Sequence, residues 1–332
     1  MQRPASEISL IIPVFRDADV VLQCLQSVLS DPMAEGLDVI VVDDASGDDT
    51  PDRIQEARLP GVRLIRRKIN GGFARACCEG WRNRDENRTY VGVLNADTVV
   101  EPGWLKRCRE VLDADPLRGC VVPSVICWDQ PDLLDSAGQS YASCGWGFRR
   151  GHLEPATRYS KIEDTFGPTG CAMLARADVI EQCGGLFRED LECYYEDTEL
   201  GFRLHKHGYR CTHVPDARVR HRISLTYNKI PARRAYFVSR NSTLLFWTGV
   251  PLRRWWSAVP QRCVLTAMLA IQAVRHGCLL PFVRGRLEAW PKILRSPSLR
   301  RSDASRNFSR GWLKEARRQS AARTAGSSGS DH

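Results

Sequence analysis

The stretch that decides the fold is LDVIVVDDASGDD, residues 37–49, in which a β-branched apolar run stops at a group of acidic residues. A short apolar run of this kind is typical of a strand buried on both faces of a parallel sheet. Residues 8–14, ISLIIPV, form a second such run. Between the two runs, apolar residues recur at helical spacing from Val20 to Leu29. The sequence therefore predicts a β-α-β unit at its start.

The same alternation continues beyond residue 49. Two further runs, at 62–65 and 90–94, have the character of buried strands, and residues 50–59 and 73–82 have helical patterns. Strand and helix thus alternate four times within about the first hundred residues. This order predicts an α/β fold with a doubly wound, mostly parallel sheet and helices on both of its faces.

The second half of the chain is less regular. We expect strands at 120–127 and 171–175, a glycine-rich aromatic loop at 136–150, and a helix at 196–207 that ends at Gly208. Beyond Arg233 the pattern is helical and rich in tryptophan and arginine. These residues predict a helical extension at the C-terminal end of the α/β region.

The basic residues are concentrated in this extension. The net charge is +9, and between Arg233 and Arg323 the only acidic residues are Glu288, Asp303 and Glu315. Such an excess suits nucleic acid, a membrane surface or an anionic substrate. No nucleic-acid-reading motif is present, so we expect no nucleic-acid partner.

Two further patterns concern the compartment. The thirteen cysteines are odd in number and show no metal-finger spacing, and the polar N-terminus shows no secretory signal, which favours reduced cysteines in the cytoplasm. The longest apolar run, residues 264–274, is shorter than the ~18–20 residues that span a bilayer. We expect it to form a buried or interfacial helix.

Acidic residues follow two of the predicted strands, where open α/β sheets bind their ligands. Asp43 and Asp44 end one strand, and Asn95 and Asp97 follow another. Capping of the next helix explains Asp43 equally well, but residues 98–102 separate Asp97 from the next helix. Asp97 therefore suits a divalent cation held between protein and phosphate oxygens. Neither GxGxxG nor GxxxxGK[ST] is present to bind phosphates without a metal.

Three other segments are candidates for the site. Asn70-Gly71-Gly72-Phe73 is a tight turn that could approach a ligand closely, although an ordinary turn has the same sequence. Glu196, Asp197 and Glu199 open a predicted helix, where the helix dipole alone favours acids, and the same dipole keeps a general base ionised. His221 follows an apolar run and, taken alone, is more typical of a packed or surface histidine than of a ligand.

Together these pieces resemble the family 2 glycosyltransferases of the GT-A fold, and most of all the rhamnosyltransferase-like branch that builds bacterial cell-surface polysaccharides. The resemblance covers roughly residues 7 to 250. The motifs that carry it, in chain order, are SLIIPVF (9–15), VVDDASGD (41–48), NGGFA (70–74), LNADT (94–98), GGLF (184–187), YYED (194–197) and VPDARVRH (214–221). Asn95 departs from a strict DxD motif, which lowers the expected charge at the metal by one.

The resemblance implies a role for each matching residue. Asp97 and His221 would bind Mg²⁺ or Mn²⁺, and Asp197 would be the catalytic base. A nucleotide-binding set would comprise Pro13, Phe15, Asp44, Asn70, Gly72 and Asn95, with Asp44 accepting a hydrogen bond from a pyrimidine imide. A set around the acceptor would comprise Glu196, Glu199, Gly170 and Trp146.

The implied reaction is an inverting transfer. A carboxylate takes the proton of an acceptor hydroxyl while the metal neutralises the leaving diphosphate. The donor would be a nucleotide sugar such as dTDP-rhamnose or a UDP-sugar, and the acceptor a glycan or a lipid-linked glycan. A nucleotidyltransferase of similar fold and a catalytically inactive, membrane-docked scaffold are the alternatives.

The resemblance also divides the chain. We expect a GT-A domain at 1–235 (nucleotide-sugar half 1–100, acceptor half 101–235), a basic Trp-rich helical region at 236–319, and a disordered tail at 320–332. The arginines and tryptophans of the helical region suit an anionic membrane surface. We therefore expect a peripheral protein on the cytoplasmic face of the plasma membrane.

Overall fold

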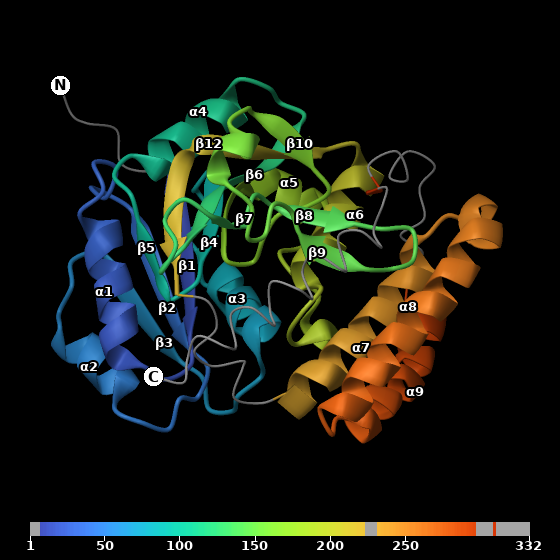
Figure 1. Cartoon of the computed structure of the whole chain (residues 1–332). Coiled ribbons are helices and arrows are strands. Elements are labelled where there is room, and N and C mark those ends of the chain that lie inside the picture. The colour runs from blue at the N-terminus through green and yellow to red at the C-terminus, as the bar shows by residue number, and fades with distance from the viewer. Residues whose placement is uncertain (1–6, 223–230, 297–307, 310–332) are drawn as a thin grey trace.

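The computed structural model describes residues 7–222, 231–296 and 308–309. The expected tail at 320–332 lies outside these residues. In the first half, strands and helices alternate as predicted (Figure 1). The elements in order are β1 (Ile8–Val14), α1 (Ala18–Leu29), β2 (Asp38–Asp43), α2 (Thr50–Glu56), β3 (Val62–Arg66), α3 (Phe73–Arg82), β4 (Tyr90–Leu94), β5 (Thr98–Val100) and α4 (Trp104–Asp113).

The second half adds short strands before its long helices. These elements are β6 (Arg118–Cys127), β7 (Leu134–Ser136), β8 (Gln139–Tyr141), β9 (Gly147–Arg149), β10 (Glu163–Thr165), β11 (Ala172–Arg176), α5 (Ala177–Gln182), α6 (Glu196–His207), β12 (Arg210–His221), α7 (Pro231–Gly249), α8 (Trp255–Arg275) and α9 (Leu279–Arg295). The helix predicted at 196–207 is confirmed, and Gly208 ends it with a positive φ of 87°.

Ten strands of the described residues form one mixed sheet, with the central order β10-β12-β6-β11-β4-β1-β2-β3. The pairs β4-β1, β1-β2, β2-β3 and β12-β6 are parallel, whereas β11 is antiparallel to both of its neighbours. The sheet is therefore mostly parallel, as predicted, with a reversal at β11. Strand β5 pairs with the end of β12, and β7 pairs with β6.

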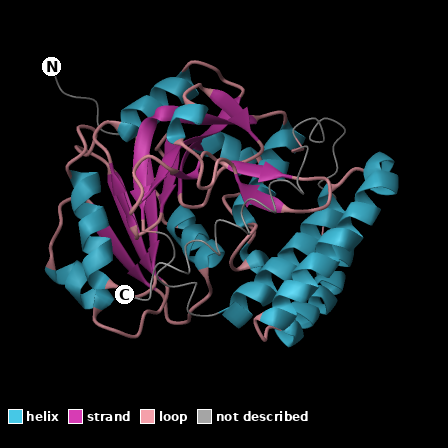
Figure 2. Cartoon of the chain, viewed as in Figure 1, coloured by secondary structure: helices cyan, strands magenta, loops and turns pink. Residues whose placement is uncertain are grey.

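Alternation along β1 divides the core into two layers, since successive side chains point to opposite faces of a sheet. Leu10 and Ile12 lie on the face covered by α1, α2 and α4, whereas Ile11 lies on the face covered by α3, α5 and α6. Figure 2 shows the strands sandwiched between helices in this way. Burial on both faces explains why the strands read as continuous apolar runs.

The C-terminal helices α7, α8 and α9 lie together beside this sandwich (Figure 1). Phe202 of α6 lies in one buried cluster with Tyr141 of β8 and with Leu245 and Phe246 of α7. Helix α7 also packs along α9. The helical region is therefore joined to the helix that begins with Glu196 and Asp197.

One prediction about local structure was wrong, and another gave a helix too short. The expected loop at 136–150 contains the hairpin β8-β9, whose strands are three residues long and so too short to show a periodicity. The apolar run at 264–274 lies in a helix, as expected, but that helix, α8, is longer than the run. The stretch Leu252–Arg275 is long and apolar enough by length and composition to cross a membrane. Counting consecutive apolar residues underestimated the length of this helix because polar residues such as Arg262 interrupt it.

All thirteen cysteines lie within the described residues, and none of them forms a disulfide there. Twelve are buried and one, Cys263, is exposed.

Candidate active site

Asp44, at the carboxyl end of β2, holds the turn that leads into α3. Its carboxylate accepts hydrogen bonds from the backbone N–H groups of Gly71 (3.0 Å) and Gly72 (2.7 Å), and it also pairs with Arg67. Asn70 Nδ2 donates to the Asp44 carbonyl oxygen at 2.9 Å. A nucleotide base could reach the Asp44 carboxylate only by sharing it with these donors. The structure thus places Asp44 under the Asn70–Gly72 turn, as its support.

Gly72 meets a steric requirement in this turn. Its φ is +84°, and a Cβ atom there would come within 2.8 Å of the Glu192 carbonyl oxygen. That oxygen accepts a hydrogen bond from Ala74 N at 2.9 Å. The turn after β3 is therefore in direct contact with the segment that precedes Glu196 and Asp197.

Pro13 and Phe15 lie at the same edge of the sheet and are half-buried. The Arg16 guanidinium carbon is 5.0 Å from the centroid of the Phe15 ring, and Arg16 N donates to Ser46 Oγ at 2.7 Å. Ser46 in turn donates to Asp43. Asp43 therefore orders the loop after β2, and the ring of Phe15 borders this edge.

Asp97 and His221 are brought together by strand pairing. Thr98, the first residue of β5, lies opposite His221, the last residue of β12. As a result, Asp97 Oδ1 lies 3.2 Å from His221 Nε2. Asp97 retains 28% of its side-chain exposure, whereas that of His221 is 9%. The predicted metal pair is therefore adjacent in space, and its carboxylate faces solvent.

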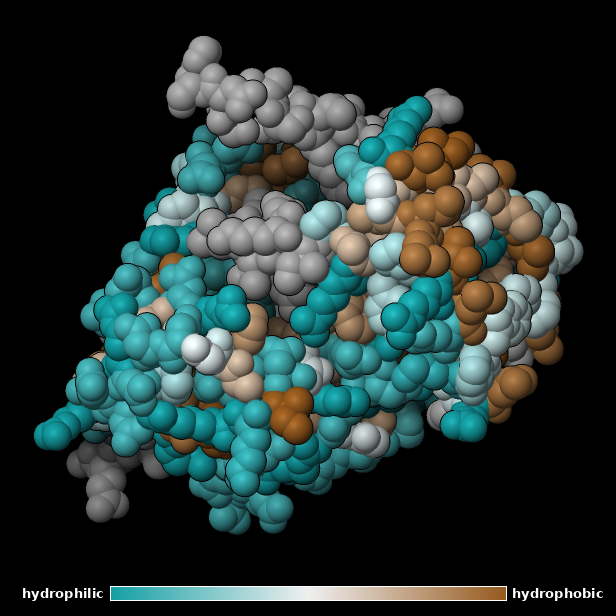
Figure 3. All heavy atoms as spheres, turned by 90° about the horizontal axis from the view of Figure 1, so that it is seen from below, coloured by the Kyte–Doolittle hydropathy of each residue, from teal (hydrophilic) through white to brown (hydrophobic). Residues whose placement is uncertain are grey.

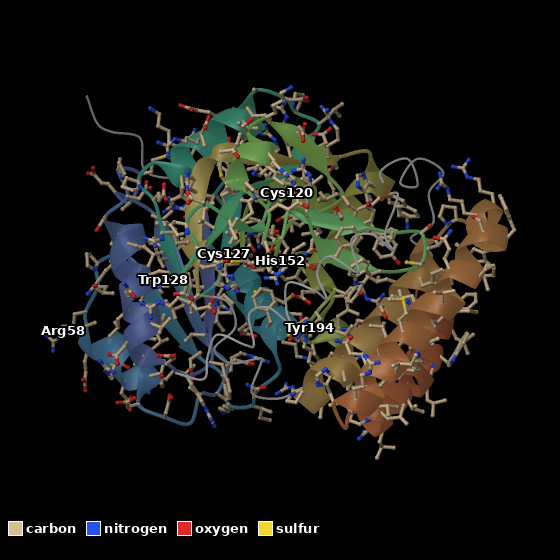
Figure 4. The ribbon with its side chains drawn as sticks, in the orientation of Figure 1. Arg58, Cys120, Cys127, Trp128, His152 and Tyr194 are labelled. Atoms are coloured by element: carbon tan, nitrogen blue, oxygen red, sulfur yellow. The ribbon has the colours of Figure 1, made fainter. Side chains whose placement is uncertain are left out.

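Asp135, which the sequence did not single out, holds the other side of His221. Its Oδ2 lies 2.9 Å from His221 Nδ1, and its Oδ1 pairs with Arg149 and lies 3.2 Å from His152 Nδ1. Asp135 is on β7 beside β6, and Cys127 of β6 lies opposite His221 in the sheet. Figure 4 shows Cys127 and His152 together in the middle of the molecule.

The charges in this cluster shift its pKa values. Burial raises the pKa of Asp135, but Arg149, His152 and His221 lower it more, so the pKa lies well below the ordinary range. Burial lowers the pKa of His221, whereas Cys171, Asp135 and Asp97 raise it well above the ordinary range. A carboxylate on Nδ1 also fixes the ring orientation, as is common for histidines that bind metals.

Asp197 is buried and oriented by four hydrogen-bond donors. Oδ2 accepts from Gln139 Nε2 (2.8 Å) and Gly170 N (3.1 Å), and Oδ1 accepts from Thr198 N (2.6 Å) and Thr198 Oγ1 (3.2 Å). Burial raises the pKa of Asp197, and these hydrogen bonds partly oppose that shift. Gln139 comes from the unpredicted hairpin, so no sequence pattern indicated this contact.

Pairing of β4 with β11 connects Asp197 with the Asp97 segment. Asn95 N donates to the Cys171 carbonyl oxygen at 2.8 Å, and the preceding residue, Gly170, binds Asp197. The thiol of Cys171 lies beside His221. Asn95, the Asp97–His221 pair and Asp197 thus converge around Gly170 and Cys171.

The other acceptor-side candidates differ in their surroundings. Glu196 is buried, its Oε2 has no hydrogen-bond partner among the described residues, and burial followed by the charge of Asp197 raises its pKa well above the ordinary range. Glu199 is buried in an ion pair with Arg203 at 2.8 Å. Trp146 stacks on Phe148 with ring centroids 4.6 Å apart and packs near Leu265 of α8. Glu199 and Trp146 therefore belong to the packing around the site.

The segment before Asp197 has an unusual backbone that α7 holds in place. Glu192, Tyr194 and Tyr195 all have positive φ values (61°, 65° and 71°), which cost free energy in residues other than glycine. Asn241 Nδ2 donates to the carbonyl oxygens of residues 191, 193 and 194 at 2.8–2.9 Å. Arg240 also binds this segment, through the Glu192 side chain at 3.0 Å. Tyr194 lies toward the C-terminal helices in Figure 4.

Comparison with known proteins agrees with this architecture. The family model described as glycosyl transferase family 2 matches residues 9–184, which is more than half of the chain. An N-acetylglucosaminyl-diphospho-decaprenol L-rhamnosyltransferase of Mycobacterium tuberculosis is 26% identical over 257 residues, which cover 71% of this chain and 81% of that protein.

Solved structures show the same fold at low sequence identity. A mannosyltransferase from Pyrobaculum calidifontis in complex with GDP-Man and Mn²⁺ has a TM-score of 0.52 at 18% identity and covers 87% of each chain. GalNAc-T7 with UDP, GalNAc and Mn²⁺ has a TM-score of 0.58 at 15% identity, covering 73% of this chain and 51% of that one. This chain therefore spans about half the length of GalNAc-T7.

These findings confirm the predicted family and fold, and they set aside the nucleotidyltransferase and inactive-scaffold alternatives. The chain belongs to glycosyl transferase family 2 and is a nucleotide-sugar glycosyltransferase with the GT-A fold.

Proposed function

We propose that this enzyme transfers a sugar, with inversion, from a nucleotide-diphosphate donor to a hydroxyl of a glycan or lipid-linked acceptor. The convergence of Asp197 with the Asp97–His221 pair around Gly170 and Cys171 carries the proposal. The donor is dTDP-rhamnose or a UDP-sugar, in keeping with the likeness to a rhamnosyltransferase. The enzyme would act at the cytoplasmic face of the plasma membrane.

The residues at Asp97 and His221 fit a divalent cation. Asp97 Oδ1 and His221 Nε2 lie 3.2 Å apart, so an oxygen and a nitrogen donor would be available to the same ion. No cluster of three or more protein ligands occurs in the described part of the chain, so diphosphate oxygens and water would complete the shell. The ion would be Mg²⁺ or Mn²⁺. The bound ion would neutralise charge that develops on the leaving diphosphate.

The protein's own groups perform the remaining tasks. Asp197, held by Gln139, Gly170 and Thr198, takes the proton of the acceptor hydroxyl. Its raised pKa makes it a stronger base than an exposed aspartate. One base, acting on the face opposite the leaving group, gives single displacement and inversion.

The donor side is formed by the turn over Asp44 and by the strand ends. Asp44 keeps Gly71 and Gly72 in place, so the backbone of the turn can approach the nucleotide. We propose that the donor contacts come from Pro13, Phe15, Asp44, Asn70, Gly72 and Asn95. We also retain the division at residue 235, with the chemistry in residues 1–235 and the acceptor's surroundings extending into 236–319.

The proposal is tested by donor binding and turnover with and without metal. A panel of nucleotide sugars should raise the melting temperature only when Mn²⁺ or Mg²⁺ is present, and EDTA should abolish transfer. Asp97→Ala should lose binding of nucleoside diphosphate, whereas Asp164→Ala, a change at an acid on β10 away from the site, should retain it. Full turnover in EDTA would refute the metal's role, and retention of the anomeric configuration in the product would refute single displacement.

A further inference from the structure

The outer sides of α8 and α9 form a continuous apolar surface. Its central residues are Val264, Met268 and Ile271 on α8 and Leu280, Leu287 and Leu294 on α9, which we call the α8–α9 apolar face. Their spacings, i, i+4, i+7 on α8 and i, i+7, i+14 on α9, place each set on one side of its helix. The α9 residues are 65–85% exposed. Figure 3 shows hydrophobic residues gathered on the side of the molecule that carries these helices, whereas the rest of that view is mostly hydrophilic.

The opposite sides of both helices are already partnered within the chain. Ala258, Leu265 and Ala273 of α8 are buried. On α9, a Cβ at Gly285 would come within 2.4 Å of the Tyr236 carbonyl oxygen, so α9 and α7 are in close contact. The exposed residues are therefore not needed for packing against the described part of the chain. Monomeric soluble proteins rarely expose so extensive an apolar surface without a partner for it.

The charges around the face select an anionic partner. Exposed arginines border it at Arg253, Arg275, Arg284 and Arg295. The one acid between residues 252 and 296 is Glu288, which accepts hydrogen bonds from Arg284 and Tyr236. Trp256, 83% exposed, and Trp290, 47% exposed, add the amphipathic rings that favour the headgroup region of a bilayer. Apolar residues flanked by arginine and tryptophan match an anionic lipid surface.

Arg262 shows how α8 would lie on such a surface. Although α8 is long enough to cross a bilayer, Arg262 lies on its inner side and is only 4% exposed. Its guanidinium donates to Ser242 Oγ (3.2 Å), Thr243 Oγ1 (3.0 Å) and the carbonyl oxygens of residues 144 and 145 (3.4 and 3.5 Å). Crossing would break these bonds and carry the charge into hydrocarbon, which is unfavourable. Arg262 is therefore not part of the exposed basic surface.

We propose that the α8–α9 apolar face inserts into one leaflet of an anionic bilayer, with α8 lying along the surface and Arg262 fastening it to the catalytic body. The segment that Arg262 binds also contacts the candidate site. Gly147 N, two residues after Gly145, donates to Tyr195 Oη at 3.3 Å, and Tyr195 directly precedes Glu196 and Asp197. Docking would thus hold the catalytic base near a membrane-held hydroxyl. Only this last consequence rests on the proposed function.

The test is sedimentation of the full chain with extruded vesicles of phosphatidylcholine alone or mixed with phosphatidylglycerol. The wild type should bind the anionic vesicles at least tenfold more tightly, and high salt should weaken the binding. Leu280→Gln/Leu287→Gln should lower the affinity at least tenfold. The matched control, Leu117→Gln/Ile162→Gln, changes two residues of the catalytic body that are 54% and 51% exposed, and it should bind as the wild type does.

Three results would overturn the inference. Equal vesicle binding by both double variants would show that the α8–α9 apolar face does not contact the membrane. Resistance of the membrane-bound chain to alkaline extraction would show that α8 crosses the bilayer. A lipid-free dimer that dissociates on Leu280→Gln/Leu287→Gln, without vesicle binding by the wild type, would assign the face to a second copy. Donor-induced thermal stabilisation, measured on the same proteins, is independent of these results and tests the proposed function separately.

Discussion

Asp135→Asn is the substitution that best tests the candidate metal site. Asp135 is 1% exposed and binds His221 Nδ1 at 2.9 Å, so it touches the proposed ligand and not the ion. The asparagine has the same shape and can still accept a hydrogen bond from Nδ1–H through its oxygen. The substitution therefore removes one negative charge while keeping the ring orientation. We expect weaker metal binding at an otherwise intact site.

The size of the effect follows from the contacts of Asp135. Loss of a carboxylate behind a metal-binding histidine typically lowers metal affinity ~10–100-fold, or about 1.4–2.7 kcal/mol. Since the asparagine oxygen keeps the hydrogen bond, we expect the lower end, about tenfold. The same change leaves Arg149 and His152 without a carboxylate. Breaking a buried ion pair costs ~3–5 kcal/mol, but the Arg149 side chain is 29% exposed, so we expect a stability loss of about 1–3 kcal/mol.

The assay is a Mn²⁺ titration of nucleoside diphosphate binding by calorimetry, together with chemical denaturation of the metal-free protein. The Mn²⁺ midpoint should rise about tenfold in Asp135→Asn, and saturating Mn²⁺ should restore binding. Asp164→Asn is the control, since Asp164 is also paired with an arginine but lies on β10. A folded Asp135→Asn protein with an unchanged midpoint, or an equal rise in Asp164→Asn, would refute the reasoning.

Two further predictions concern Asp197 and the segment before it. Asp197→Asn should lower turnover ~10²–10⁴-fold with near-normal donor binding, and turnover that survives in the variant would exclude Asp197 as the base. In the wild type, kcat should fall as the pH drops through a pKa above the usual aspartate range, because the base must be ionised and burial raises its pKa. The two N–H groups of the Asn241 amide are shared among three carbonyl oxygens of residues 191–194, and the Leu191 oxygen also has Arg240 as a donor. Asn241→Leu therefore removes the equivalent of two hydrogen bonds, and at ~0.5–1.5 kcal/mol per bond we expect a loss of about 1–3 kcal/mol in the free energy of unfolding, and lower kcat. Exposed Asn87→Leu is its control in denaturation, and equal stability of the two variants would contradict the role of Asn241.

Local pattern was sufficient to predict the first half of the fold. Buried parallel strands are continuous apolar runs, and the helices between them are amphipathic. For this reason β1 to β4 and the intervening helices could be predicted from residues that are close together in the sequence. The hairpin β8-β9 could not, because its three-residue strands depend on turns at glycines and on packing against α6. For the same reason Gln139, which binds Asp197, was missed.

The sequence by itself determined the family, and it pointed to Asp97, His221 and Asp197 as the candidate site residues, because they lie in motifs with characteristic local spacing. Only the tertiary structure decided their partners. Asp135 lies beside His221, and Asn241 holds the segment before Asp197, across separations of 86 and about 50 residues in the chain. Tertiary structure also reversed the interpretation of Arg262, which the sequence grouped with a basic surface and the fold buries. Contacts of this kind arise from antiparallel pairing and helix packing between distant segments, which leave no periodicity in the sequence.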